Sequence, residues 1–168
     1  MFLVKNADSG QQAALKRILS SPQFPDACNE VRLLRTLPAH RYIVRVEGAE
    51  TRRTASGDEE GLLVLELCRS GSLLELLERR RRPLTEAELL GVLARVCEAV
   101  AHLHAQQPPV AHRDLKPENV LLAGPADELD QLRLADFGSA STVAHQPSND
   151  VTRLAAETDI SGRTTWAY

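Results

Sequence analysis

A short run at 112–119, His-Arg-Asp-Leu-Lys-Pro-Glu-Asn, holds a carboxylate, an ammonium group and an amide within six residues. A second carboxylate, Asp136, follows 22 residues after Asp114 in the tripeptide Asp-Phe-Gly. Groups of these types suit phosphoryl transfer, in which a phosphate, metal ions and an acceptor hydroxyl must be held in line with little covalent chemistry from the protein. An Asp-Phe-Gly tripeptide alone would mean little, but both motifs at this spacing do not arise by chance.

The run at 112–119 resembles the catalytic loop of protein kinases, and Asp-Phe-Gly resembles their magnesium-binding motif. The resemblance implies that Asp114 orients the acceptor hydroxyl and receives its proton. It implies that Asn119 and Asp136 hold Mg²⁺ and that Lys116 contacts the transferring phosphate of ATP. A lysine two residues after Asp114 is the serine/threonine-kinase pattern, so a protein serine or threonine is the expected acceptor.

Upstream, Ala14-Leu15-Lys16 resembles the kinase strand whose lysine pairs with the α- and β-phosphates. Glu30, in the following helical segment, matches the acid that fixes this lysine through an ion pair. Two plainer readings stay open: a lysine at a strand end is often only solvated, and Glu30 suits the surface of any helix.

The apolar segment 62–68 resembles the strand and hinge that receive adenine. In that register Leu65 is the gatekeeper, and the backbone of Glu66 and Cys68 hydrogen-bonds the base. Leu121 forms the floor of the pocket and Ala14 its roof. Each apolar residue could equally be ordinary core, and Cys68 is better read as a small buried apolar residue than as a reactive thiol.

Several longer matches narrow the resemblance to the Numb-associated kinase family, which includes the adaptor-associated and cyclin-G-associated kinases. They are Ala-Leu-Lys-Arg at 14–17, Glu-Leu-Cys-Arg-Ser-Gly-Ser at 66–72, the segment 103–114, Ala-Asp-Phe-Gly-Ser-Ala-Ser at 135–141, and Thr-Thr-Trp-Ala-Tyr at 164–168. The resemblance implies ATP and Mg²⁺ as cofactors, a clathrin-adaptor subunit as protein substrate and a role in endocytic traffic.

The elements that must position these groups are strands first and helices second, which predicts an α+β, two-lobe protein-kinase-like fold. Residues 1–68 are expected to form a partial N-lobe with the hinge, and 69–168 a partial C-lobe. Strands are expected at 2–4, 13–19, 43–46, 62–67, 120–122 and 132–135, with a short helix over 28–37 and a surface loop over 51–61. From Gly138 onward the low periodicity predicts a long loop.

Two capping boxes open the helical part. Ser72 and Glu75 form the first, and Thr85 and Glu88 the second. The second box precedes an apolar stripe at helical spacing, formed by Leu89, Val92, Leu93, Val96, Val100 and Leu103, which ends before Pro108.

Composition limits the class of protein. With 43% hydrophobic and 26% charged residues, the 168-residue chain suits one globular domain, and its net charge of −3 argues against a nucleic-acid binder. Three widely spaced cysteines fit a reducing compartment. No apolar run is long enough for a membrane span and no signal peptide is present, so a cytoplasmic protein is expected.

Compared with the kinase pattern, the sequence lacks the Gly-rich loop before Met1 and the Ala-Pro-Glu motif after Tyr168. We therefore expect an incomplete catalytic domain that folds poorly and transfers little phosphate on its own, because apolar residues would lose burial. The alternative function is a catalytically inactive, truncated kinase that acts as a binding or scaffold fragment. Candidate activation-loop phosphorylation sites are Ser141, Thr142, Ser148, Thr152, Thr158 and Ser161, although each could be a solvated hydroxyl.

Overall fold

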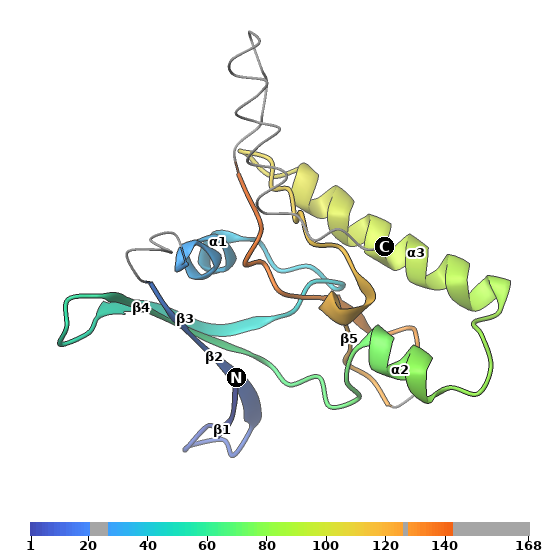
Figure 1. Cartoon of the computed structure of the whole chain (residues 1–168), viewed down its shortest axis with the longest axis horizontal. Coiled ribbons are helices and arrows are strands. Elements are labelled where there is room, and N and C mark those ends of the chain that lie inside the picture. The colour runs from blue at the N-terminus through green and yellow to red at the C-terminus, as the bar shows by residue number, and fades with distance from the viewer. Residues whose placement is uncertain (21–26, 126–127, 143–168) are drawn as a thin grey trace, which may run out of the picture.

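The computed structural model describes residues 1–20, 27–125 and 128–142. The first part of the chain forms a four-stranded antiparallel sheet in the order β1-β2-β4-β3 (Figure 1). Its strands are β1 (Phe2–Lys5), β2 (Gln12–Leu19), β3 (Val46–Arg53) and β4 (Glu59–Glu66). The predicted polar turn joins β1 to β2, and the side chain of Asn6 accepts hydrogen bonds from two backbone N–H groups in it.

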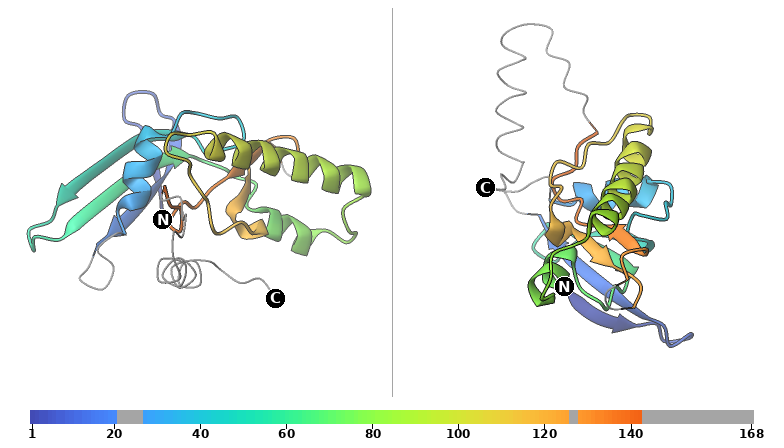
Figure 2. Two further views of the ribbon diagram at one scale, coloured as in Figure 1. Left: turned by 90° about the horizontal axis from the view of Figure 1, so that it is seen from above. Right: turned by 90° about the vertical axis from the view of Figure 1, so that its right-hand side faces the viewer.

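Helix α1 (Asn29–Thr36) packs against this sheet and buries Val31 and Leu34 (Figure 2). Gly61 on β4 permits the close approach, because a Cβ atom there would lie 2.5 Å from Cγ2 of Val31. The helix ends before Pro38, and Leu37 already has an extended backbone, as expected for a residue that precedes proline. The predicted helix over 28–37 is therefore confirmed.

The second part of the chain is helical, with α2 (Leu73–Arg79) and the long α3 (Glu86–His104). Both predicted capping boxes are present. Ser72 accepts a hydrogen bond from the N–H of Glu75 and Thr85 accepts one from Glu88, while each glutamate side chain bonds back to the backbone of its cap. These bonds satisfy backbone N–H groups that the first turn of a helix leaves unpaired.

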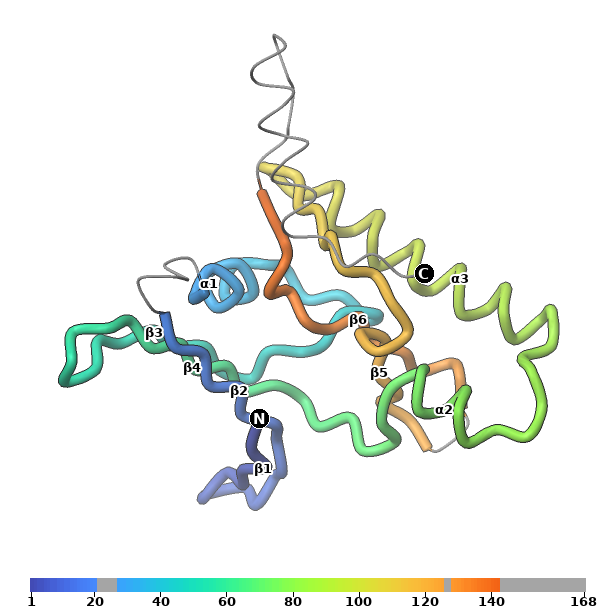
Figure 3. The backbone as a smooth tube through the Cα atoms, in the orientation of Figure 1, coloured from blue at the N-terminus to red at the C-terminus, as the bar shows by residue number. Residues whose placement is uncertain are grey.

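A short 3₁₀ helix, η1 (Pro117–Asn119), leads into a two-stranded antiparallel sheet of β5 (Val120–Leu122) and β6 (Leu132–Leu134). The segment between α1 and β3 runs beside β6 (Figure 3). There the N–H of Val44 donates to the carbonyl of Leu134 at 2.9 Å, and the N–H of Leu134 donates to Tyr42 at 2.8 Å. The two parts of the chain are thus joined by backbone hydrogen bonds.

Two apolar clusters form the core. The larger one spans both parts of the chain, with Val31 and Leu63 from the first part and Leu103, Leu134 and Phe137 from the second. The smaller one lies beneath α2 and the β5–β6 sheet. The larger cluster fixes α1, the four-stranded sheet and the segment after β6 relative to one another, and these elements carry the candidate site.

Two boundary predictions are wrong. The predicted loop over 51–61 covers only 54–58, because β3 continues to Arg53 and β4 begins at Glu59. The charged residues at these strand ends suit a loop in the sequence, but their charges pair across the sheet, as between Arg52 and Glu60. Ile43 is not in a strand either and forms only an isolated bridge to Leu134.

The apolar stripe of α3 is only partly buried. Val92 and Leu103 are in the core, whereas Leu89 and Leu93 are 47% and 49% exposed among the residues that the structure describes. Ala99, which lies outside the predicted stripe, is fully buried. Within residues 1–20, 27–125 and 128–142, no helix is both long and apolar enough to cross a membrane.

Candidate active site

Lys16 lies on β2, on the sheet face that packs toward α1. Its Nζ is 2.9 Å from Oε1 and 2.8 Å from Oε2 of Glu30, whose side chain is only 3% exposed. Burial by itself lowers the pKa of Lys16, but the carboxylates of Glu30 and Asp136 outweigh it and raise the pKa above its ordinary value. The side chain of Lys16 is therefore a positively charged ammonium group that the two carboxylates hold in place.

Asp136 reaches the same ammonium group from the segment after β6, with Oδ1 2.8 Å from Nζ of Lys16. Burial raises the pKa of Asp136, but the hydrogen bond and charge of Lys16 more than offset this, so the pKa lies below its ordinary value. Asp136 has a φ of +60°, a strained conformation for a non-glycine residue. The next N–H, that of Phe137, donates to Oε1 of Glu30 at 3.3 Å. Glu30 thus holds both the lysine and the backbone that presents Asp136.

The run at 112–119 forms a second group around Asp114. Nδ2 of Asn119 donates to the carbonyl oxygen of Asp114 at 2.8 Å and to its Oδ2 at 2.9 Å. Nζ of Lys116 is 2.9 Å from the same Oδ2. The hydrogen bond to Asp114 raises the pKa of Lys116 above its ordinary value, and the negative charges of Glu118 and Asp136 add to this effect.

His112 and Phe137 position these acids, a role that the motifs alone did not assign. Nε2 of His112 lies 3.0 Å from the carbonyl oxygen of Ala135 and must donate to it, so Nδ1 is free to accept the N–H of Asp114 at 3.4 Å. Burial lowers the pKa of His112, consistent with this neutral form. Its ring packs edge-on against the ring of Phe137, with the two ring centroids 4.8 Å apart. In the sequence, the only signal for this positioning role is that His112 and Phe137 stand close to the two acids within the motifs.

The predicted adenine residues lie at the junction of the two parts. Ala14 pairs with Leu65 across β2 and β4, and both Ala14 and Leu121 pack against the larger core cluster. Glu66 ends β4, and its N–H donates to the carbonyl of Arg45 at 2.9 Å. Burial raises the pKa of Cys68 to about 11, so its thiol is protonated.

Comparison with known proteins identifies the family. The protein kinase domain model matches residues 1–160. The chain belongs to the protein kinase domain family. The predicted kinase lineage and fold class are confirmed by this match.

Curated relatives agree with the family. A Dictyostelium discoideum protein named "Probable serine/threonine-protein kinase" is 34% identical over 173 residues, covering 100% of this chain and 15% of the relative. In Schizosaccharomyces pombe, the protein kinase domain-containing protein ppk38 is 37% identical over 94% of this chain and 24% of its own length. The serine/threonine-protein kinase ppk30 is 36% identical over 83% and 14%. The chain therefore spans a quarter or less of these relatives.

Kinase-family membership implies ATP and a divalent metal. The described residues contain no cluster of three or more His, Cys, Asp or Glu that could hold a metal without other ligands. Mg²⁺ does not need one, because it takes one or two protein oxygens together with phosphate and water. Asp136 supplies an ionised carboxylate and Asn119 an amide oxygen, since Nδ2 of Asn119 is bound to Asp114. The N–H of Ala135 donates to the carbonyl of Asn119 at 2.8 Å, which ties these two segments together. The donor set fits Mg²⁺.

Two sets of predicted residues lie beyond this description. Of the candidate phosphorylation sites, Ser148, Thr152, Thr158 and Ser161 lie outside the described residues, as does the matching segment at 164–168. Ser141 is described and pairs with Ala111 through two backbone hydrogen bonds of 2.9 Å.

Proposed function

We propose that this chain supplies the catalytic centre of an ATP-dependent serine/threonine protein kinase. One observation carries the proposal: Lys16 is held between Glu30 and Asp136 at 2.8–2.9 Å, and Asn119, which fixes Asp114, is tied by its carbonyl to the N–H of Ala135, directly before Asp136. The lysine–glutamate pair and the metal-binding aspartate must both be in place for kinase catalysis. Elements from separate parts of the chain bring these groups together, which an incidental surface ion pair would not require.

Each residue has a role that follows from its contacts. Lys16, kept protonated by two carboxylates, would bind the α- and β-phosphates of ATP. Asp136 and Asn119 would hold Mg²⁺, which neutralises charge on the β- and γ-phosphates. Asp114, whose Oδ2 is fixed by Asn119, would orient the acceptor hydroxyl and take its proton. Lys116 is within 2.9 Å of Asp114 and would contact the transferring phosphate.

Transfer from radiolabelled ATP to a serine- and threonine-rich protein such as casein tests the proposal. The protein should be used as its gene encodes it, beside Asp114→Asn, which keeps the shape of the side chain but removes the base. We expect transfer in the parent and a loss of about 100-fold or more in the variant. Transfer that is equal in both would overturn the assignment of Asp114. Magnesium-dependent ATP binding without transfer would favour the binding or scaffold fragment instead.

We further propose membership of the Numb-associated subfamily, with a threonine of a clathrin-adaptor subunit as substrate and a cytoplasmic location. The support is the set of sequence matches at 66–72 and 135–141. Phosphorylation of a recombinant adaptor subunit should exceed that of casein and should be lost when the acceptor threonine is changed to alanine. Equal rates on both proteins would remove the support for this substrate.

We also propose that the lobe boundary follows Cys68, so that 1–68 and 69–168 belong to different lobes. The connection between β4 and α2 supports this, because it links the four-stranded sheet to the helical part of the chain. Limited proteolysis should cleave near residues 69–71 before it cleaves within β4 or α2. First cleavage inside either element would place the boundary elsewhere.

A further inference from the structure

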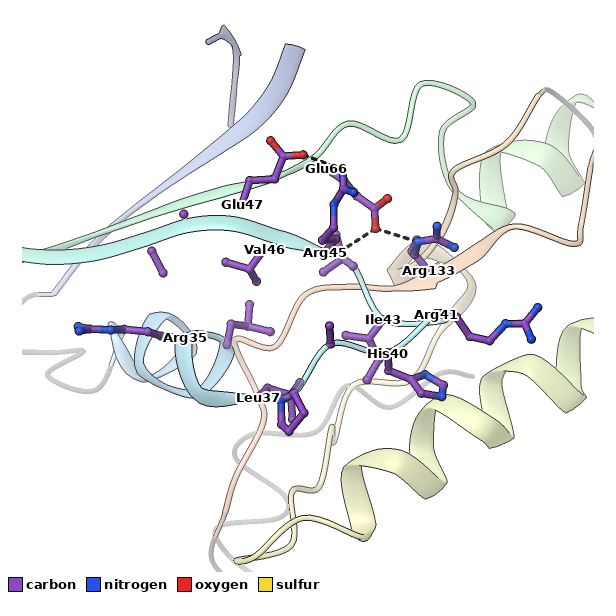
Figure 4. A pocket seen from close by; sticks show the side chains of 16 residues that line it. Arg35, Leu37, His40, Arg41, Ile43, Arg45, Val46, Glu47, Glu66 and Arg133 are labelled. Atoms are coloured by element: carbon purple, nitrogen blue, oxygen red, sulfur yellow. Dashed lines mark hydrogen bonds and ion pairs between the residues drawn. The ribbon is translucent and has the colours of Figure 1, made fainter. Parts of the chain in front are cut away.

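A groove of about 490 Å³ lies behind the candidate active site, between α1, the segment 37–45, β3 and β6 (Figure 4). Its floor is apolar and includes Leu34, Leu37, Ile43, Val46 and Ala49. None of the residues with an assigned catalytic or metal-binding role lines it. The groove is therefore separate from the candidate active site, although Glu66 of the proposed hinge borders it.

The rim of the groove is basic. Four arginines and two glutamates line it, an excess of two positive charges in a chain whose net charge is −3. Two arginines are neutralised in place: Arg45 lies 2.8 Å from Glu47, and Arg133 lies 2.8 Å from Glu66. The positive charge that remains comes from the other two.

Those two are Arg35 and Arg41. Both are exposed, and within the described residues neither guanidinium group forms an ion pair. Arg41 rests over the ring of Tyr42 at 4.7 Å. In Figure 4, Arg35 projects from α1 on one side of the apolar floor and Arg41 from the segment after Pro38 on the other. A ligand that crosses the floor would therefore meet a positive charge on each side.

We propose that this groove is a docking site for an acidic peptide in which acidic residues flank a short apolar anchor. The anchor fills the apolar floor, and carboxylates on either side pair with Arg35 and Arg41. Guanidinium groups match carboxylates in bidentate geometry, and complementary rim charges set which partner is accepted. The described lining contains no Phe, Tyr or Trp on which nucleic-acid bases could stack, which favours a peptide over a single-stranded nucleic acid.

Fluorescence anisotropy with a labelled peptide, Glu-Asp-Ile-Phe-Asp-Glu, tests the proposal on the protein as its gene encodes it. We expect saturable binding that weakens as salt is added. The peptide Lys-Lys-Ile-Phe-Lys-Lys keeps the anchor and reverses the charge, and Glu-Asp-Ala-Ala-Asp-Glu keeps the charge and removes the anchor. Each should bind about tenfold more weakly or worse.

Variants locate the binding. Arg35→Glu with Arg41→Glu should weaken the probe by about tenfold or more, and Arg35→Glu alone should weaken it less. The single variant Arg35→Glu removes a charge of the groove without removing a ring contact, because Arg41 packs on Tyr42, whereas Arg35 packs on no ring among the described residues. Arg81→Glu makes the same charge change at an exposed residue outside the groove and should leave binding within about twofold. Thermal melts followed by circular dichroism check that each variant is folded.

Three results would overturn the proposal. The first is no saturable binding of the probe by the parent protein. The second is equal binding by the folded Arg35→Glu variants and by Arg81→Glu. The third is binding of the lysine peptide as tight as that of the acidic one.

Discussion

Two ion networks of similar form lie on opposite faces of the same sheet. On one face Lys16 is held between the carboxylates of Glu30 and Asp136. On the other, the carboxylate of Glu60 is held between two arginines of the neighbouring strands. Successive residues of β2 supply one member to each network, because side chains alternate between the faces of a strand. The two networks therefore share a scaffold and differ in what they connect.

The Glu60 network is local. Its partners Arg17 and Arg52 come from β2 and β3, which both pair with β4, and their side chains are 50% and 57% exposed. The Lys16 network joins β2, α1 and the segment after β6, and its Asp136 is 48% exposed. One network holds neighbouring strands together. The other joins distant segments and leaves a carboxylate accessible to a metal ion, which is what a catalytic centre requires.

Removing the two central charges should separate the networks by function. Lys16→Met keeps a long apolar stem but removes the ammonium group, and we expect phosphoryl transfer to fall by about 100-fold or more. Glu60→Gln removes the central charge of the other network and should leave transfer within about twofold. Steady-state kinetics with radiolabelled ATP measure both. Comparable losses of phosphoryl transfer in the two variants would contradict a catalytic role for the Lys16 network alone.

The close packing of α1 on the sheet positions Glu30 of the Lys16 network, whereas, within the described residues, the Glu60 network has no member on α1. In Gly61→Ala the new Cβ would lie 2.5 Å from Val31, which must shift α1 and the Glu30 it carries. We expect the free energy of unfolding to fall by about 1–3 kcal/mol, measured by urea denaturation. Gly48→Ala is a matched control, because its Cβ would sit 3.7 Å from Val64, an ordinary contact. Equal stability of the two variants would contradict the close approach at Gly61.

The smallest effect should come from the pH dependence of the Glu60 network. Hydrogen bonds from Arg17 and Arg52 hold the pKa of Glu60 below its usual 4.5. Because the folded-state pKa is lowered, the stabilisation is present above about pH 4.5 and is lost as pH falls through the folded-state value. Wild type should therefore be slightly more stable than Glu60→Gln near pH 7. The two should converge in acid, as urea denaturation would show. A difference that grows on acidification would reverse the assigned sign.

Much of the arrangement at 112–119 could be predicted because its residues are contiguous. The run at 112–119 carries Asp114, Lys116 and Asn119 close together, and the structure places all three in mutual contact. The capping boxes were equally readable, since each depends on residues three apart. Local chemistry at short spacing leaves a signal in the sequence, and the structure retains it.

Features that depend on contacts between distant residues could not be predicted. The ends of β3 and β4 were missed because their charged residues are stabilised by partners across the sheet. The exposure of Leu89 follows from what packs against α3, which periodicity cannot specify. The basic groove was invisible for the same reason, because Arg35 and Arg133 are brought together only by folding.

The central claim is that Asp136, shared with Lys16, is available to hold Mg²⁺ for ATP. Isothermal titration of ADP with and without Mg²⁺ tests it most directly in the parent and in Asp136→Asn, with Glu60→Gln as control. We expect Mg²⁺ to strengthen nucleotide binding in the parent and in the control, and to lose this effect in Asp136→Asn. An unchanged magnesium effect in folded Asp136→Asn would contradict the account.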